Sequence, residues 1–249
     1  PEALDADVET IRAWYAEEGY IEAQVDAPSV SLSTDRRSLH VTIPVTPGRR
    51  YRVGGVRVDG DTFEDAGITE RAIRRIIEEG EPAGAMQDRF QRSAGAAGWE
   101  DTRRRPFDFE ARVRPLVTGE WFSMGAAREV TEQITLLYGD EGYAFAQTWP
   151  GLLPDDETGL VDVDFQLRAG EQYRIDRIHI TGNDPTLDRV IRREIPTTEG
   201  ALYARSDLTA ARLRLNRLGA FESVAITTPR VGTGPVSYTH LRAHETVRN

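Results

Sequence analysis

The sequence predicts an α+β fold built from tandem copies of one module, and two observations lead to this prediction. The segment 51–60 returns 122 positions later as 173–182, without a gap and with its tyrosine, arginine and final glycine unchanged. Stretches with helical spacing of apolar residues follow each copy, and segments with strand-like alternation come next. Each module is therefore expected to be β-α-α-β-β, with a three-stranded mixed sheet covered on one face by two helices.

The repeated segment contains a shift in its alternation. The apolar residues Tyr51 and Val53 occupy alternate positions, and a second alternating pair begins at Val56. The phase of the alternation slips by one residue between the two pairs. The same slip separates Ile175 from Ile178. A slip of one residue turns a strand over, so we expect a β-bulge or a change from connector to strand. We expect the residues before the slip to pack towards the preceding module and to form an inter-module joint: Tyr51, Val53, Tyr173 and Ile175.

The first segments read as the second half of a module. Residues 4–18 have the periodicity of an amphipathic helix that ends at Gly19. A strand is expected over 20–25, an extended segment over 29–33 and an alternating strand over 39–43. The chain opens on Pro1 rather than Met, so we expect a fragment with incomplete modules at both ends.

The next segments read as one whole module and part of a third. Helices are expected over 68–79 and 124–140, followed by a strand after Gly142 and a strand over 161–167. After the repeated strand at 173–180, helices are expected over 187–195 and from an N-cap at Ser206, and then a strand over 221–227. The expected modules are 1–47, 48–169 and 170–235, the last without its final strand.

Two segments depart from the repeat. About 37 residues at 81–117 are inserted between the helices of the middle module. They are interpreted as a mobile surface insertion or, alternatively, as a docking element that uses Arg103–Arg105 with Phe107 and Phe109. Residues 236–249 lack the expected alternation and resemble translated sequencing-adapter read-through, so this tail is interpreted as non-native.

Composition and motifs argue against several function classes. A net charge of −10 argues against a general nucleic-acid binder. The chain has no cysteine and no apolar run of 18 residues, and none of its four histidines lies in a catalytic or metal-binding motif. The acidic run 59–65 misses the spacing of a calcium loop. We therefore expect no enzyme activity, no cofactor and no metal.

The module pattern resembles a known family. Tyr-x-Val/Ile…Gly openings, the run Arg212–Val224, Ile180-Thr-Gly-Asn-Asp and Tyr20–Val25 are together similar to POTRA domains, the polypeptide-transport-associated modules that precede outer-membrane β-barrels. The likeness covers most of 1–235 apart from the insertion. It implies the last three modules of the periplasmic arm of an outer-membrane β-barrel assembly factor, with a C-terminal barrel that this chain lacks.

The resemblance also implies partners. Unfolded outer-membrane proteins, accessory assembly lipoproteins and the outer membrane are expected, and no nucleic acid. Two other readings stay open: a paralogous translocation-assembly or two-partner-secretion transporter, and a periplasmic scaffold without a barrel. Because barrel precursors are strand formers, we expect them to bind open sheet edges by β-augmentation. The candidate edge residues are Tyr20, Glu22, Gln24, Tyr143, Phe145, Gln147, Trp149, Phe221, Ser223 and Ala225.

Overall fold

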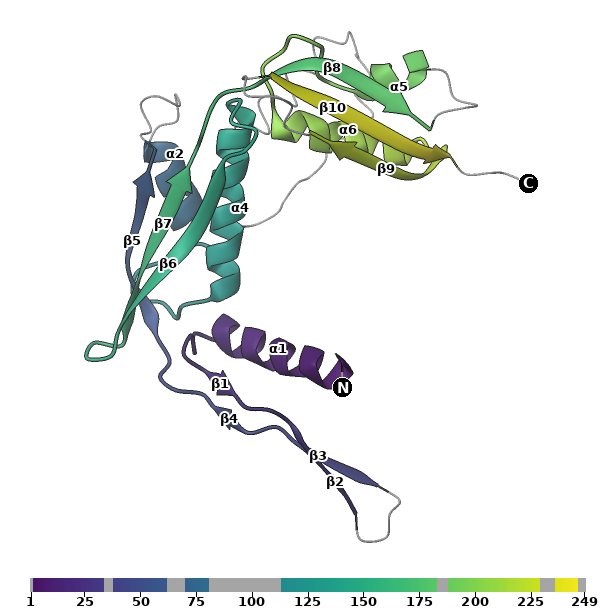
Figure 1. Cartoon of the computed structure of the whole chain (residues 1–249). Helices are drawn as coiled ribbons and strands as arrows, with labels where there is room; N and C mark the ends of the chain where they lie inside the picture. Colours follow the sequence, from purple (N-terminus) through teal and green to yellow (C-terminus); the bar gives the residue numbers. More distant parts are fainter. Residues whose placement is uncertain are drawn as a thin grey trace.

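The computed structural model describes residues 2–33, 38–61, 70–80, 113–182, 188–228 and 236–245. Its helices are α1 (Glu2–Glu17), α2 (Glu70–Arg74), the π-type η1 (Arg75–Glu79), α4 (Met124–Asp140), α5 (Asp188–Glu194) and α6 (Arg205–Arg217). Its strands are β1 (Gln24–Val25), β2 (Ser29–Leu32), β3 (Leu39–Thr42), β4 (Val45–Thr46), β5 (Arg52–Gly60), β6 (Gln147–Asp155), β7 (Leu160–Arg168), β8 (Arg174–Thr181), β9 (Phe221–Thr227) and β10 (Val236–Glu245). Figure 1 shows them in three groups along a bent arm.

The middle group is a three-stranded mixed sheet in the order β5-β7-β6. β7 pairs in parallel with β5 and antiparallel with β6, and α4, α2 and η1 lie on one face (Figure 1). Val161, Val163, Phe165 and Leu167 are all buried, which confirms the alternation read from the sequence. The register between β5 and β7 shifts between Val53 and Val56, which confirms the predicted bulge.

The core of the middle group extends from the repeated segment to the helix α4. It contains Tyr51, Val53, Phe122, Ile134 and Phe165, with further residues from η1 and β7. Tyr51 and Val53 therefore pack inside the core of their own sheet, and Tyr51 also forms hydrogen bonds with Gly19 and Glu22 of the preceding group. In the C-terminal group, apolar residues form two smaller clusters.

The C-terminal group is a second mixed sheet in the order β8-β10-β9, with α5 and α6 beside it (Figure 1). This arrangement corrects the expectation that the segment from 170 ends without its last strand, because Val236–Glu245 forms the central strand. β10 pairs in parallel with β8 and antiparallel with β9. Backbone hydrogen bonds between strands do not require apolar alternation, which is why the pattern of this segment did not predict a strand. The non-native origin of 236–249 stays a prediction.

The N-terminal group consists of α1 and two short strand pairs. β1 pairs with β4, and β2 pairs with β3 to form a hairpin that projects from the arm (Figure 1). Val30 faces Val41 and Leu32 faces Leu39 across the hairpin, and all four side chains are exposed. One face of this hairpin is therefore apolar and uncovered by any described residue.

The strand expected over 20–25 is shorter than predicted, because its first residues end the helix. Tyr20 donates its backbone N–H to the carbonyl of Tyr15 at 2.9 Å, across Gly19 with a φ of 90°. Tyr143 does the same to Tyr138 at 3.1 Å after Gly142. Both are Schellman-type helix ends, so the N–H group of each tyrosine is used before a strand can begin. Turns follow, and the strands start at Gln24 and Gln147.

The insertion lies mostly outside the described residues. Of 81–117, the structure describes 113–117, where Val113 and Leu116 are buried in the middle core. The predicted roles of Arg103–Arg105, Phe107 and Phe109 fall outside the described residues and stay predictions. The helix expected over 68–79 is described from Glu70 onwards.

Candidate functional site

The ten candidate edge residues fall into two classes in the structure. Residues on strands are Gln24, Gln147, Trp149, Phe221, Ser223 and Ala225, and residues in turns before strands are Tyr20, Glu22, Tyr143 and Phe145. Tyr143 is buried in the middle core, and the ring of Phe145 packs edge-on against Tyr173 at 5.0 Å. The turn residues are therefore part of helix ends and joints rather than sheet edges.

The outer edge of β6 is depleted of hydrogen-bond donors by two prolines. Pro150 and Pro154 lie opposite Phe165 and Val161 of β7. Proline is tolerated in an edge strand where its nitrogen faces away from the neighbouring strand, and residues four apart share one orientation. The outward positions are therefore 148, 150, 152 and 154, and prolines occupy two of them. A strand added along β6 would find half of these N–H donors missing.

The outer edge of β9 contains no proline and borders a groove. β9 is the last strand of the order β8-β10-β9, so no strand in the described part of the chain pairs with its other side. The groove has a volume of about 490 Å³. Its lining comes from α6 and β9: Arg212, Leu213, Asn216, Phe221, Glu222, Ser223 and Val224. Of the three predicted edges, β9 alone combines a strand of seven residues, a full set of N–H groups and a groove.

The joints between the groups repeat one pattern of backbone hydrogen bonds. Tyr51 donates its N–H to the carbonyl of Gly19 at 3.0 Å, and Tyr173 donates to Gly142 at 2.8 Å. Each tyrosine carbonyl then accepts from a segment of its own sheet, Tyr51 from Phe122 at 3.1 Å and Tyr173 from Tyr203 at 2.9 Å. The two tyrosines thus connect the end of one helix to the next sheet in the same way.

A carboxylate caps the next helix at both joints. Glu17 at the end of α1 accepts the N–H of Gly125 in the first turn of α4 at 2.7 Å. Asp140 at the end of α4 accepts the N–H of Ser206 in the first turn of α6 at 2.8 Å. Ser206 was predicted to be the N-cap itself, but α6 begins one residue earlier and takes its cap from Asp140. Each acidic residue therefore joins the end of one long helix to the start of the long helix in the next group, α1 to α4 and α4 to α6.

Further polar contacts link the groups at both joints. Glu17 also accepts hydrogen bonds from Arg114 and from the hydroxyl of Ser123, and Arg114 pairs with Glu129 at 2.8 Å. Arg50 binds Glu18 of α1 at 3.0 Å. The guanidinium Cζ atoms of Arg50 and Arg52 both lie over the ring of Trp121, 4.3 Å and 3.9 Å from its centre. At the second joint, Gln172 donates to the carbonyl of Glu141 at 2.9 Å.

These contacts shift several pKa values. Burial alone would raise the pKa of Glu17, but the hydrogen bonds from Arg114, Ser123 and Gly125 outweigh it and hold that pKa below its ordinary value. The pKa of Glu129 is lowered in the same way by Arg114, against the effect of burial. A hydrogen bond to Asp156, followed by burial and a second bond to Glu22, raises the pKa of Tyr51. The phenol of Tyr51 therefore stays protonated and tethers Glu22 of the N-terminal group.

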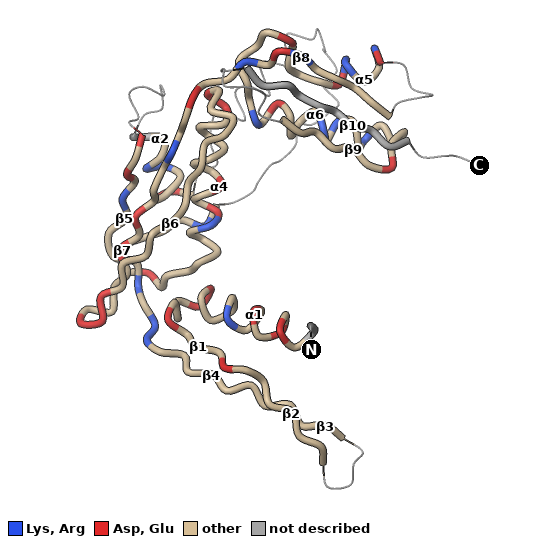
Figure 2. The backbone as a smooth tube through the Cα atoms, in the orientation of Figure 1, with Lys and Arg blue, Asp and Glu red and all other residues tan. Residues whose placement is uncertain are grey.

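The described residues hold no group of three or more His, Cys, Asp or Glu side chains with metal-binding geometry. Within those same ranges, no helix is long and apolar enough to cross a membrane. His40 and His179 lie exposed on β3 and β8. The acidic run 59–65 is described up to Asp61, whose carboxylate accepts the N–H of Ala169 at 2.5 Å. Figure 2 shows further acidic residues at the turn between β6 and β7.

Comparison with known proteins agrees with this architecture. A family model described as "POTRA: Surface antigen variable number repeat" matches residues 1–48 and 173–239. The crystal structure of Haemophilus influenzae BamA POTRA3-5 superposes with a TM-score of 0.68 at 21% identity, covering 97% of this chain and 80% of that one. The outer membrane protein assembly factor BamA of Neisseria meningitidis is 25% identical over 228 residues, which is 91% of this chain and 24% of the relative.

The chain is similar to the POTRA region of BamA. A BamA from Neorickettsia risticii supports this with 35% identity over 119 residues, 48% of this chain and 16% of the relative. The chain spans about a quarter of the length of the first curated relatives it matches. These relatives are named as outer membrane protein assembly factors, which agrees with the location expected from the sequence.

The features of the candidate site that the sequence did not indicate depend on which strands and helices lie next to each other. Pro150 and Pro154 are visible in the sequence, but their effect depends on β6 being an edge strand. Glu17 and Asp140 each stand two residues before a helix-ending glycine, at Gly19 and Gly142, and this spacing is the signal that could have found them.

Proposed function

We propose that this POTRA region is the periplasmic arm of an outer-membrane protein assembly factor and that it binds unfolded β-barrel precursors by β-augmentation. The names of the curated relatives support the first part. The open edge of β9 beside its groove carries the second part, because unpaired N–H and C=O groups recruit an extended backbone. In this proposal Phe221, Ser223 and Ala225 lie along the added strand.

The candidate positions on the other predicted edges receive less support. Gln24 lies on a strand of two residues, and Gln147 and Trp149 lie on the proline-containing β6. A strand of two residues offers too few backbone groups for specific pairing. We therefore place the main precursor site of the predicted set on β9.

Site-specific photo-crosslinking tests this proposal. A photoreactive residue replaces Ser223 on β9 and, as a control, Thr10 on the exposed face of α1. The chain is mixed with an outer-membrane β-barrel protein diluted from urea, and in parallel with an unfolded helical protein. We expect crosslinks from position 223 to the barrel protein and few from position 10. Equal yields from both positions, or equal yields with the helical protein, would contradict the proposal.

We also propose that the segment 170–235 binds an accessory assembly lipoprotein and that the native protein continues into a membrane β-barrel. Both follow from the likeness to BamA, of which this chain covers a quarter. Co-purification of the chain with periplasmic lipoproteins tests the first, with a chain truncated before 170 as the control. Recovery of the same lipoproteins with the truncated chain would place their binding elsewhere.

A further inference from the structure

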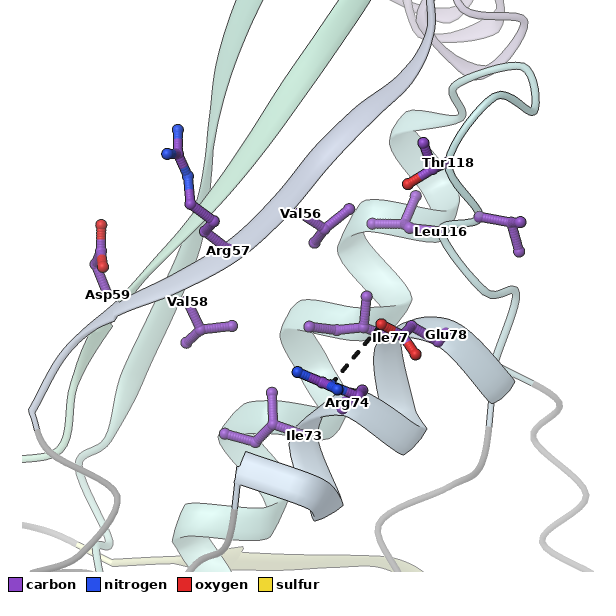
Figure 3. Close-up of a pocket in the computed structure, with 11 residues that line it drawn as sticks. Val56, Arg57, Val58, Asp59, Ile73, Arg74, Ile77, Glu78, Leu116 and Thr118 are labelled. Atoms are coloured by element: carbon purple, nitrogen blue, oxygen red, sulfur yellow. Dashed lines mark ion pairs between the residues drawn. The ribbon is translucent and has the colours of Figure 1, made fainter.

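A groove runs along the outer edge of β5 in the middle sheet (Figure 3). It has a volume of about 640 Å³ and lies between β5, the helical segments α2 and η1, and the segment 116–118. In Figure 3, Val56 and Val58 point from the strand towards Ile73 and Ile77, while Arg57 and Asp59 point away. The side of the groove that faces the helices is therefore apolar.

The backbone of β5 has hydrogen-bonding groups directed into this groove. Asp61 donates its N–H to the carbonyl of Leu167 on β7 at 3.2 Å. Orientation alternates along a strand, so residues 57 and 59 also direct their backbone groups at β7, and Val56 and Val58 direct theirs to the open side. Among the described residues, no hydrogen bond reaches the backbone of Val56 or Val58 from that side.

The chain itself pairs with the beginning of this edge. Val53 donates its N–H to the carbonyl of Glu120 at 2.8 Å, and Gly119 donates to the carbonyl of Val53 at 2.8 Å. Next along the strand, the hydroxyl of Thr118 donates to the carbonyl of Gly54 at 2.9 Å. The open part of the edge thus continues a backbone pairing that already exists.

In the C-terminal sheet, side chains form hydrogen bonds with the backbone of the equivalent edge and so seal it. Ile178 of β8 corresponds to Val56 by the offset of the repeat. Its N–H donates to the carboxylate of Glu199 at 3.0 Å, and its carbonyl accepts from the guanidinium of Arg192 at 3.1 Å. Arg192 and Glu199 also lie 3.7 Å apart as an ion pair. Together they provide the acceptor and the donor that a neighbouring strand would provide.

The middle sheet has different residues at the sealing positions. Alignment of Gly119 with Gly200 puts Thr118 where the C-terminal sheet has Glu199. The counterpart of Arg192 is Arg74, which pairs with Glu78 one helical turn further on at 3.9 Å (Figure 3). The acceptor for the N–H of Val56 is therefore missing from the described part of the middle sheet.

We propose that the β5 edge is a second strand-binding site, and that its ligand is an extended segment with apolar residues at alternate positions. A peptide backbone provides both groups that Glu199 and Arg192 provide in the other sheet. Alternate side chains of such a segment enter the apolar groove, and the others face solvent beside Arg57 and Asp59. Transmembrane β-strands have this alternation. The site thus deepens the proposed function and rests on it.

Introducing a carboxylate into the middle sheet at the position that Glu199 occupies in the C-terminal sheet tests this site. The probe is a synthetic ten-residue peptide that alternates Val or Tyr with Thr or Lys, and its binding is measured by fluorescence anisotropy. Hydrogen exchange at Val56 and Val58 reports which edge is occupied. We expect the peptide to slow exchange at both amides. Thr118→Glu should weaken this protection about fivefold, because its carboxylate competes for the N–H of Val56. Thr10→Glu on α1 adds the same charge elsewhere and should change nothing.

The possible outcomes separate this site from the proposed function. Protection at Val56 and Val58 that Thr118→Glu weakens supports the second site. Protection on β9 without protection on β5 overturns the second site and leaves the proposed function standing. No protection on any sheet edge contradicts both. If Thr118→Glu unfolds the middle sheet, protection of Val56 and Val58 in the unaltered chain decides alone.

Discussion

Replacing Glu17 with alanine should loosen the connection between α1 and α4. Glu17 caps α4 through Gly125 and accepts hydrogen bonds from Ser123 and Arg114. Loss of a helix cap costs about 1 kcal/mol. The ion pair adds at most about 1 kcal/mol, since Arg114 is half exposed and Glu17 about a third. We therefore expect Glu17→Ala to lower the free energy of local unfolding by about 1–2 kcal/mol.

Hydrogen exchange of the Gly125 amide measures this effect locally. A loss of 1–2 kcal/mol corresponds to exchange about 5 to 30 times faster at neutral pH. Glu9→Ala is the matched control, because Glu9 lies on the same helix and, within the described ranges, its ion pair is with exposed Arg12. An acceleration in Glu17→Ala no greater than in Glu9→Ala would refute the cap.

The effect of Glu17→Ala should also depend on pH. The folded pKa of Glu17 lies below its ordinary value of 4.5. A lowered pKa means that the charged form stabilises the fold above about pH 4.5, and that this contribution is lost as the pH falls through the folded value. The difference in exchange between the wild-type chain and Glu17→Ala should therefore shrink as the pH falls below 4.5. A difference that does not change with pH below 4.5 would contradict the electrostatic part of the argument.

Three further predictions concern the joints and the β6 edge. Tyr51→Phe should lower the free energy of unfolding in urea by about 1–2 kcal/mol, because the phenol binds Glu22 and Asp156. Tyr173→Phe should change it by less than about 0.5 kcal/mol, because the buried hydroxyl of Tyr173 has no described partner. Equal losses in the two variants would contradict this difference. Gly19→Ala should lower the melting temperature more than Gly200→Ala, although both glycines have a positive φ. A Cβ at Gly19 would meet the carbonyl oxygens of Phe122 and Tyr51 at 3.0 and 3.1 Å, whereas a Cβ at Gly200 would meet nothing within 4 Å. Equal melting temperatures would refute the close approach at Gly19. Pro150→Ala with Pro154→Ala should restore two outward N–H groups and raise self-association in sedimentation; an unchanged monomer would show that prolines do not protect β6.

The sequence predicted the regular elements of the fold well where local pattern determines them. The helix α4 begins and ends where its periodicity predicted, and the inward residues of β7 are buried as expected. The bulge in β5 followed from the phase slip around Val53 and Val56. These features depend on side-chain spacing within one element, which is visible in the sequence.

The sequence did not predict features that depend on the surroundings of an element. The start of β6 was placed too early, because the N–H of Tyr143 closes α4 before the strand begins. The segment 236–245 was rejected as a strand, although a gap between β8 and β9 can be filled by any extended backbone. The seal formed by Arg192 and Glu199 requires the sheet order, which local pattern does not determine.

Hydrogen exchange across all sheet edges, with and without an unfolded outer-membrane β-barrel protein, tests the central claim most directly. The account predicts slower exchange along Phe221–Thr227 of β9 and at Val56 and Val58 of β5 when the barrel protein is present. It also predicts unchanged exchange at Thr148 and Leu152 of β6 and at Ile178 of β8, where prolines or side chains occupy the edge. Unchanged exchange along β9 in the presence of the bound barrel protein would contradict the claim that precursor strands add to this sheet.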